Sequence, residues 1–275
     1  MGESAGEFRL GLVGWPLENT LSPAIHEEFF RSTGLRGEYS AFPVRPGTLD
    51  ESLAGLFDGG ITGLNVTFPY KLESAALCDE LEGDALRLGA VNTLKYSGGI
   101  LRGFNTDGFG FRRCLDRLSL KEPFVLVGCG GAALAADLAL AGLDIERSVF
   151  CRNPGGWRGL AEARPLHELE GELQGCPGGT LVNATTLGWA DGDDFPVSAP
   201  SMSGTAFLDL NYNPGWVWRN RLAETGATVF TGETMLVFQA AGSFEIWTGR
   251  MPDADRALRV IRSGRRSGDC IEHRP

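Results

Sequence analysis

The chain has 275 residues, of which 43% are hydrophobic and 22% are charged, and its formal net charge is -10. This size and composition are typical of a soluble globular protein, and they favour two domains. The acidic balance opposes general attraction to nucleic acid or to anionic membranes, although a local basic pocket can still hold an anionic ligand. We therefore expect a small-molecule partner.

The sequence indicates neither a membrane anchor nor a disulfide or metal framework. It contains no run of about eighteen apolar residues, and its first residues, MGESAGEFRL, are too acidic for a signal peptide. We expect a cytoplasmic protein that binds neither membranes nor nucleic acid. The cysteines form no C-x-x-C pair, so neither a disulfide framework nor a zinc site is expected. The polar, basic tail from residue 262 is predicted to be a solvated end.

The N-terminal part of the chain alternates predicted strands with predicted helices. Apolar runs predict strands at residues 10–14, 37–44 and 61–66. Helical spacing predicts helices at residues 23–33 and 49–58. This alternation indicates an α/β domain with a mainly parallel sheet.

The segment GLNVTFPYK, residues 63–71, places a lysine just beyond one of these strands. Because proline cannot continue the hydrogen bonding of a strand, the chain must leave the sheet at Pro69. Lys71 is then at the C-terminal edge of the strand, where open α/β sheets bind ligands. The alternative is a solvated lysine that opens the helix predicted over residues 72–81, since lysines are mostly exposed.

A second set of elements begins after residue 107. Helical spacing over residues 108–118 is followed by a new strand at 123–128, which indicates a domain boundary. The elements predicted beyond it are a helix at 132–141, strands at 148–151, 180–183 and 206–210, and a helix at 235–249. The last helix is rich in aromatic residues and is predicted to be amphipathic. We expect it to pack back on the first domain.

A glycine-rich turn lies between the first strand and the first helix of this second set. Gly128, Gly130 and Ala133 fit the pattern G-x-G-x-x-G/A in the strand-to-helix context that the motif needs. Gly128 permits a tight turn, Gly130 lets the backbone approach a pyrophosphate, and Ala133 lets helix and strand pack closely. The same turn adds Gly131 and Ala132 to the expected cofactor site. A purely structural turn is the alternative.

The next predicted strand ends in Cys151, Arg152 and Asn153. In NAD-binding domains an acidic residue near this position holds the 2′-hydroxyl of the ribose. The guanidinium of Arg152 suits a 2′-phosphate instead, and Arg158 can assist, so the sequence favours NADP. The alternative is an exposed arginine at a strand end that binds no ligand.

Further polar residues are concentrated in short segments at predicted loops and strand ends. These segments are NTLSPAIH at 19–26, GAVNT at 89–93, GFNTDG at 103–108 and FQ at 238–239. Each has an ordinary explanation when taken alone. Thr20 and Ser22 precede Pro23 and are typical helix caps, while Asn92 and Asp107 are typical of turns.

Taken together, these segments and their order along the chain resemble the shikimate dehydrogenase family over most of the sequence. The resemblance also rests on GLNVTFPYK, VGCGGAALA, NATTLGW at 183–189, DLNYNP at 209–214 and TGETMLVFQA at 231–240. It implies reversible reduction of 3-dehydroshikimate to shikimate with NADPH, in aromatic amino acid and chorismate biosynthesis. It also implies a substrate-binding catalytic domain at 1–107, a Rossmann NADP-binding domain at 108–236, and C-terminal helices at 237–275 that pack back on the substrate domain. We expect a monomer or a homodimer.

The resemblance also implies a role for each matching residue. The implied catalytic pair is Lys71 and Asp107, and the implied holders of the substrate carboxylate are Thr20 and Ser22. The other implied substrate contacts are Thr67, Asn92, Tyr212 and Gln239. The further implied cofactor contacts are Asn183, Thr185, Gly232 and Met235. Because a nearby carboxylate favours charged lysine, Lys71 is expected to donate a proton in the reductive direction and Asp107 to orient it.

The chain departs from the usual family pattern at two places. Asn19 and Thr20 replace a histidine and a serine, and Cys151-Arg152-Asn153 replaces Asn-Arg-Thr. The extra methyl of Thr20 affects which ring substituents fit. Loss of the threonine beside Arg152 removes a phosphate donor, so use of NAD at lower preference is expected. The alternatives are a relaxed quinate/shikimate or aminoshikimate dehydrogenase and a non-catalytic shikimate-sensing module.

Overall fold

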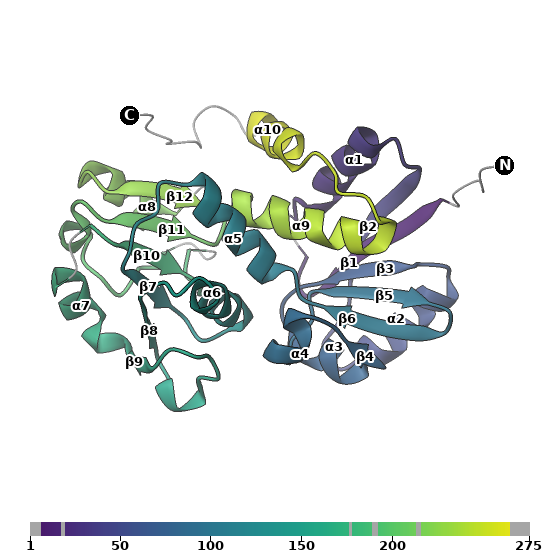
Figure 1. The fold of residues 1–275 in the computed structure, drawn as a ribbon, viewed down its shortest axis with the longest axis horizontal. Helices are drawn as coiled ribbons and strands as arrows, with labels where there is room; N and C mark the ends of the chain where they lie inside the picture. Colours follow the sequence, from purple (N-terminus) through teal and green to yellow (C-terminus); the bar gives the residue numbers. More distant parts are fainter. Residues whose placement is uncertain (1–6, 18–19, 176–177, 189–191, 213–215, 265–275) are drawn as a thin grey trace. The chain divides into compact units, whose positions relative to one another are not determined.

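The computed structural model describes residues 7–17, 20–175, 178–188, 192–212 and 216–264 (Figure 1). The chain divides into two compact units. The first comprises Met1–Thr106 and Val237–Gly264, and the second contains Asp107–Leu236. The chain returns to the first unit within helix α9 (Glu233–Thr248). The predicted α/β fold class with two domains is confirmed. Asn19 and the tail beyond Gly264 lie outside the described residues.

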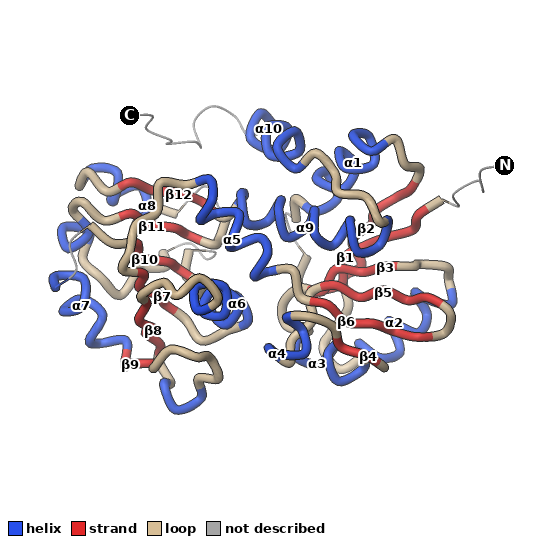
Figure 2. Tube along the Cα trace, in the orientation of Figure 1, coloured by secondary structure: helices blue, strands red, loops and turns tan. Residues whose placement is uncertain are grey.

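The strands of the first unit, red in Figure 2, form a mixed sheet in which the longest strands are parallel. Its strands are β1 (Phe8–Gly14), β2 (Gly37–Pro43), β3 (Gly63–Val66), β4 (Glu80–Leu81), β5 (Thr93–Ser97) and β6 (Ile100–Phe104). Their order is β2-β1-β3-β5-β6-β4. Strand β1 pairs in parallel with β2 and β3, whereas β5 pairs antiparallel with β3 and β6.

Two local features of this sheet differ from the sequence-based prediction. The helix predicted over 72–81 is shorter, because α3 (Lys71–Leu77) ends where Cys78 adopts an extended backbone. Residues 80–81 then form β4, which pairs with β6. The β5–β6 hairpin was not predicted, although Gly98 and Gly99 between its strands both have positive φ, as a two-residue hairpin turn requires.

Helices cover both faces of this sheet. They are α1 (Ser22–Thr33), α2 (Leu49–Asp58), α3, α4 (Asp84–Leu88), α9 and α10 (Ala254–Gly264). Apolar residues of α2, α3 and α4 share one core with β1, β3 and β5. Helix α10 packs beside α1 (Figure 1). The prediction that α9 is amphipathic is wrong, because every α9 side chain except Glu245 is at least partly buried.

An aromatic cluster joins α1 to α9 within the first unit. His26 is fully buried and stacks on Tyr39, with ring centroids 3.9 Å apart and an interplanar angle of 5°. Phe29, Phe244 and Trp247 surround the imidazole. Burial lowers the pKa of His26 to about 3, and the neighbouring Asn65 side chain opposes that shift only in part. The imidazole is therefore neutral at pH ~7.

The sheet of the second unit is wholly parallel in its described pairs. Its strands are β7 (Phe124–Val127), β8 (Arg147–Cys151), β9 (Ala163–Pro165), β10 (Thr180–Asn183), β11 (Ala206–Asp209) and β12 (Thr228–Thr231). The order β12-β11-β10-β7-β8-β9 is that of a Rossmann fold. Its strand order reverses between β7 and β10, and such a switch point is where open α/β sheets bind ligands.

Helices also cover both faces of the second sheet. They are α5 (Asp107–Arg117), α6 (Gly131–Ala141), α7 (Leu169–Gly175) and α8 (Val217–Glu224), with 3-10 turns at Pro154–Gly156, Leu166–Glu168 and Ala199–Met202. Alternate residues of β7 enter different cores. Phe124 and Leu126 pack with α5 and α6, whereas Val125 and Val127 share a core with α7 and α8.

The buried imidazole makes the stability of the first unit sensitive to acid. The pKa of His26 is about 3 in the folded protein, against an ordinary value of 6.5 that applies to the unfolded chain. Between these pH values the unfolded chain binds one proton more than the folded protein, so the free energy of unfolding decreases as the pH falls. We expect His26→Phe to retain the stack and to remove this penalty, which amounts to roughly 2 to 3 kcal/mol at pH ~4.5. Denaturant unfolding of both proteins at pH ~4.5 and ~7.5 measures it; an equal pH dependence contradicts the prediction.

Candidate functional site

Lys71 follows a turn that is held to the first sheet at two points. The Thr67 amide donates a hydrogen bond to the Val13 carbonyl at 3.0 Å. The buried hydroxyl of Tyr70 donates to the Val44 carbonyl at 2.6 Å. Lys71 is the first residue of α3 and is half-buried. Its backbone is therefore fixed just past the C-terminal end of β3.

Backbone hydrogen bonds also place Asn92 beside this segment. The Val91 amide donates to the Lys71 carbonyl at 2.7 Å, and the Val66 amide donates to the Asn92 carbonyl at 2.8 Å. The structure thus brings Thr67, Lys71 and Asn92 to one edge of the first sheet.

Asn92 is linked through its side chain to Thr106 and Gln239. Its Nδ2 donates to Thr106 Oγ1 at 2.9 Å and to Gln239 Oε1 at 3.2 Å. Its Oδ1 accepts from the Thr106 amide at 2.9 Å. Asn92 is 2% exposed, so these bonds are shielded from water. Sequence reasoning missed Thr106, whose signal was its place beside Asp107 in GFNTDG.

Thr20 and Ser22 lie at the start of α1, but they do not cap it. The N-cap residue is Leu21, and no side chain makes a capping hydrogen bond there. The Ser22 amide donates instead to Thr20 Oγ1 at 3.3 Å. The alternative that these hydroxyls serve as helix caps is therefore not what the structure shows.

Asp107 and Tyr212 belong to the second unit. Asp107 is the first residue of α5 and is 4% exposed. Tyr212 follows β11 and is half-buried. Both thus lie at the ends of regular elements of that unit.

The glycine-rich turn fits an approaching pyrophosphate. Gly128 has a φ of 128°, and a Cβ there would lie 2.8 Å from the Ala184 carbonyl oxygen, across the switch point. Gly130 is extended, and a Cβ there would have no described heavy atom within 4 Å. Gly131 and Ala132 follow in the first turn of α6. The turn therefore offers open backbone at a helix N-terminus, where phosphate groups bind.

Arg152 lies directly beyond β8 and is exposed, as is Arg158. The Gly128 amide donates to the Phe150 carbonyl at 2.9 Å, so the glycine-rich turn is joined to the end of β8. Arg152 accordingly belongs to the same edge of the second sheet as the turn. Its side chain is accessible to an anionic ligand there.

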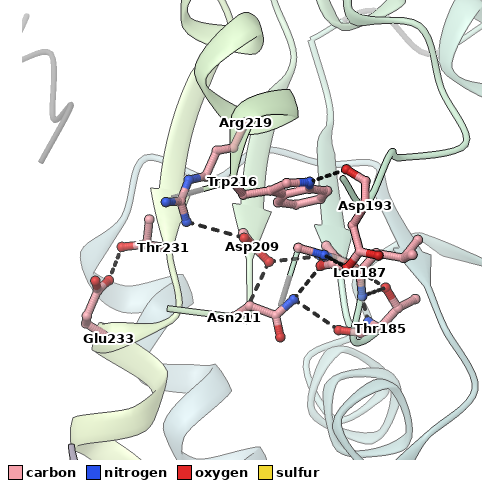
Figure 3. A network of polar contacts seen from close by, with 11 residues as sticks. Thr185, Leu187, Asp193, Asp209, Asn211, Trp216, Arg219, Thr231 and Glu233 are labelled. Atoms are coloured by element: carbon pink, nitrogen blue, oxygen red, sulfur yellow. Dashed lines mark hydrogen bonds and ion pairs between the residues drawn. The ribbon is translucent and has the colours of Figure 1, made fainter. Parts of the chain in front are cut away.

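Asn183 and Thr185 shape the loop that follows β10, and Figure 3 shows Thr185 and Leu187 of that loop. Asn183 Nδ2 donates to Asp209 Oδ1 at 2.9 Å and to the Leu187 carbonyl at 3.0 Å. Asn183 Oδ1 accepts from the Thr185 amide at 3.1 Å and from its hydroxyl at 2.6 Å. These side-chain contacts hold the loop in place beside the glycine-rich turn.

Asp209 stabilises the neighbouring loop and was not predicted as a site residue. It is 1% exposed, accepts from the Asn211 amide at 3.1 Å, and forms an ion pair with Arg219 at 3.4 Å (Figure 3). Burial raises the pKa of Asp209 to about 7, and Arg219 opposes that shift. Asn211 Nδ2 donates to the Thr185 carbonyl at 3.1 Å, which ties the two loops together.

Gly232 and Met235 lie at the start of α9. A Cβ at Gly232 would overlap the Leu210 carbonyl oxygen, so the close packing of these segments needs glycine. Met235 is buried, and its side chain shares a core with Phe111 and Leu208.

The part of the chain that the structure describes has neither a metal-binding cluster nor a membrane-spanning helix. No group of three or more histidine, cysteine, aspartate or glutamate side chains there is placed to hold a metal ion. None of the helices described is both long enough and apolar enough to cross a bilayer.

Comparison with known proteins identifies the family. The profile of the shikimate dehydrogenase substrate binding domain matches residues 12–94, and that of the shikimate 5′-dehydrogenase C-terminal domain matches residues 232–262. The chain is 41% identical to the NADP(+) shikimate dehydrogenase of Methanopyrus kandleri, over 87% of this chain and 90% of that protein. The chain belongs to the shikimate dehydrogenase family.

Solved structures of the family have the same fold. Shikimate 5-dehydrogenase from Thermus thermophilus, in complex with NADP(H) and shikimate, has a TM-score of 0.82 and 32% identity, covering 94% of this chain and 100% of that one. The enzyme from Listeria monocytogenes, in complex with shikimate and NAD, has a TM-score of 0.77 and 27% identity, covering 95% and 99%. The family resemblance seen in the sequence is confirmed.

The two glycines of the turn make a matched pair for mutation. We expect Gly128→Ala to destabilise the protein, because its φ and the Ala184 carbonyl leave no room for a Cβ. Gly130→Ala should keep the melting temperature and raise the Kd for NADPH at least about 10-fold, because its Cβ would occupy the backbone's approach to a pyrophosphate. Thermal melts and fluorescence titration with NADPH measure both effects. If both variants changed the melting temperature and the Kd for NADPH alike, the distinction between a structural Gly128 and a cofactor-binding Gly130 would be contradicted.

Proposed function

We propose that this protein catalyses the reversible reduction of 3-dehydroshikimate to shikimate with NADPH, as a step of aromatic amino acid and chorismate biosynthesis. The observation that carries the proposal is the placement of Lys71, Thr67 and Asn92 at one sheet edge, with Gln239 bonded to Asn92. Membership of the shikimate dehydrogenase family supports it.

Lys71 is the proposed proton donor. NADPH, when bound, supplies a hydride to the ring carbonyl carbon. The ammonium of Lys71 gives its proton to the carbonyl oxygen, so the product gains one hydride and one proton. In the oxidation direction, the neutral amine takes the hydroxyl proton. Asp107 is proposed as the carboxylate that orients the lysine and accepts a hydrogen bond from a ring hydroxyl.

The remaining substrate contacts are proposed from side-chain chemistry. Thr20 and Ser22 offer hydroxyl donors to the substrate carboxylate. The proposed contacts for the ring, through hydroxyl or amide groups, are Thr67, Asn92, Gln239 and Tyr212. The amides of Asn92 and Gln239 are already oriented by their mutual hydrogen bond, which favours one arrangement of ring hydroxyls over others.

The second unit is proposed to hold NADP. The turn at Gly128, Gly130, Gly131 and Ala132 fits the pyrophosphate, and the exposed guanidinium of Arg152 fits the 2′-phosphate. Further proposed cofactor contacts are Asn183, Thr185, Gly232 and Met235. The Listeria monocytogenes complex with shikimate and NAD supports NAD as a second cofactor, and we propose that this protein uses it at lower preference. A cytoplasmic location and a monomeric or homodimeric state remain predictions.

Two alternatives have separate tests. A relaxed quinate/shikimate or aminoshikimate dehydrogenase is favoured by the extra methyl of Thr20, and kcat/KM for shikimate, quinate and aminoshikimate with both cofactors distinguishes it. A non-catalytic shikimate sensor would bind shikimate without turnover. Reduction of NADP by the purified protein on addition of shikimate supports the enzyme; shikimate binding without that reduction favours the sensor.

Lys71→Ala tests the proton donor. We expect kcat to fall about 10²-fold or more while shikimate binding changes far less, as is usual for general acid-base groups. Lys121→Ala is the matched control, because Lys121 is an exposed lysine of the second unit. Stopped-flow and steady-state assays measure both variants. Near-normal turnover in Lys71→Ala would refute the assignment.

Arg152→Ala tests cofactor choice. We expect KM for NADPH to rise about 10-fold or more and KM for NADH to stay almost unchanged, because only NADPH carries the 2′-phosphate that the guanidinium binds. Arg36→Ala, which removes an exposed arginine from the first unit, is the control. Equal losses with the two cofactors would mean that Arg152 has a structural role.

A further inference from the structure

A chain of buried polar side chains adjoins the proposed ring contacts, and the proposed mechanism does not use it. Asn65 lies in β3, Thr93 opens β5 and Ser243 lies in α9; they are 5%, 0% and 0% exposed. The antiparallel register sets Asn65 opposite Thr93. Ser243 is four residues beyond Gln239, so both share one face of α9.

The distances join these side chains to the proposed site. Ser243 Oγ lies 2.7 Å from Thr93 Oγ1 and 2.9 Å from Asn65 Nδ2. Thr93 Oγ1 lies 2.8 Å from Asn92 Oδ1. Asn92 Nδ2 in turn donates to Gln239 Oε1 at 3.2 Å. A continuous path of hydrogen bonds therefore runs from Asn65 to Gln239.

The direction of the path follows from counting protons. Asn92 Oδ1 can only accept, so the Thr93 hydroxyl donates its one proton to it. The contact of 2.7 Å between Thr93 and Ser243 then takes the Ser243 proton, which Ser243 shares with the Gln239 backbone carbonyl at 3.1 Å. Ser243 Oγ accepts from Asn65 Nδ2, and Asn65 Oδ1 accepts from the Tyr39 hydroxyl at 2.8 Å. Every step thus points toward Asn92.

The donors that converge on Asn92 Oδ1 decide which end of each amide faces which neighbour. The Thr93 hydroxyl and the Thr106 amide both donate to Asn92 Oδ1, which leaves Nδ2 directed at Gln239 Oε1. A flipped Asn92 would set two carbonyl oxygens against each other and would leave buried donors without acceptors. Leaving a buried polar group unsatisfied is strongly unfavourable.

We propose that Thr93 and Ser243 are positioning residues that fix the amide orientations of Asn92 and Gln239, and through them the pattern of ring hydroxyls that the site accepts. The inference rests on the proposed function, since it presumes that these amides contact the ring. Thr93 and Ser243 act through their neighbours and make no contact with substrate themselves.

Thr93→Val and Thr93→Ser form a matched pair for the test. Valine keeps the shape and removes the hydroxyl, whereas serine keeps the hydroxyl and removes a methyl. We expect Thr93→Val to raise KM for shikimate about 5- to 30-fold, which corresponds to one or two kcal/mol. It should lower discrimination against shikimate analogues that lack one ring hydroxyl, and leave KM for NADP unchanged. Thr93→Ser should keep KM for shikimate and the discrimination against analogues within about 3-fold of the wild-type values, since the hydrogen bond is retained.

A double-mutant cycle with Gln239→Ala separates positioning from a general loss of stability. If Thr93 acts through the amides, its effect on KM for shikimate should largely disappear once Gln239 is replaced, because the two losses are coupled. Three results would each overturn the proposal. They are additive effects of Thr93→Val and Gln239→Ala on KM for shikimate, the same KM for shikimate in the valine and serine variants, and a rise in KM for NADP equal to that for shikimate. If melting curves show that Thr93→Val does not fold, Ser243→Ala carries the same measurements.

The wild-type protein, assayed in parallel with shikimate and NADP, keeps two possible failures apart. Inactive wild-type protein contradicts the proposed function and, with it, the presumed ring contacts. If the wild-type protein is active and the Thr93 and Ser243 variants have the same KM for shikimate as the wild type, the proposed function stands. Only the positioning role is then refuted.

Discussion

The edge of the first sheet that carries Thr67 and Lys71 depends on the hydrogen bonds of one buried asparagine, Asn92. The backbone of Asn92 donates to Phe104 and accepts from Val66, which ties it to the ends of two strands. Its side chain reaches Thr106 and Gln239, which are far apart in sequence. Because a primary amide carries donors at one end and acceptors at the other, it can satisfy several segments at once while remaining buried.

In the second unit a different asparagine, Asn183, holds the loops at the edge of the sheet. Asn183 ends β10, its backbone carbonyl accepts from the Leu210 amide, and its side chain bonds Asp209 and the Leu187 carbonyl. In both units an asparagine at the C-terminal edge of a sheet orders the loops that leave it. These edges are where a ligand needs fixed polar groups, and hydrogen bonding to neighbouring segments supplies rigidity that a loop alone lacks.

Much of the fold could be predicted because it is encoded locally. The strand predicted at 123–128 contains β7, because the four residues Phe124–Val127 are all apolar and all buried. The hairpin at Gly98-Gly99 was missed despite a local signal. The predicted helix at 72–81 was too long, because pairing of residues 80–81 with β6 overrides the local pattern.

The candidate site was predictable where motifs carry it, as at Lys71 and the glycine-rich turn. Thr93 and Ser243 could not be found in this way: 150 positions separate them, and a small hydroxyl in an apolar helix looks like ordinary core packing. Only the folded chain shows that α9 sets Ser243 against β5. Residues that act by contact across the fold leave no spacing pattern in the sequence.

The directed path from Tyr39 to Gln239 also bears on how substrate choice can change during evolution. Each member of the path is hydrogen-bonded to the next, so removal of one polar group inside it leaves a neighbour unsatisfied. Thr20 and Thr67 are not members of it. New substrate preferences are therefore expected to arise by substitution at positions such as Thr20 and Thr67. The residues of the buried path are expected to stay unchanged together.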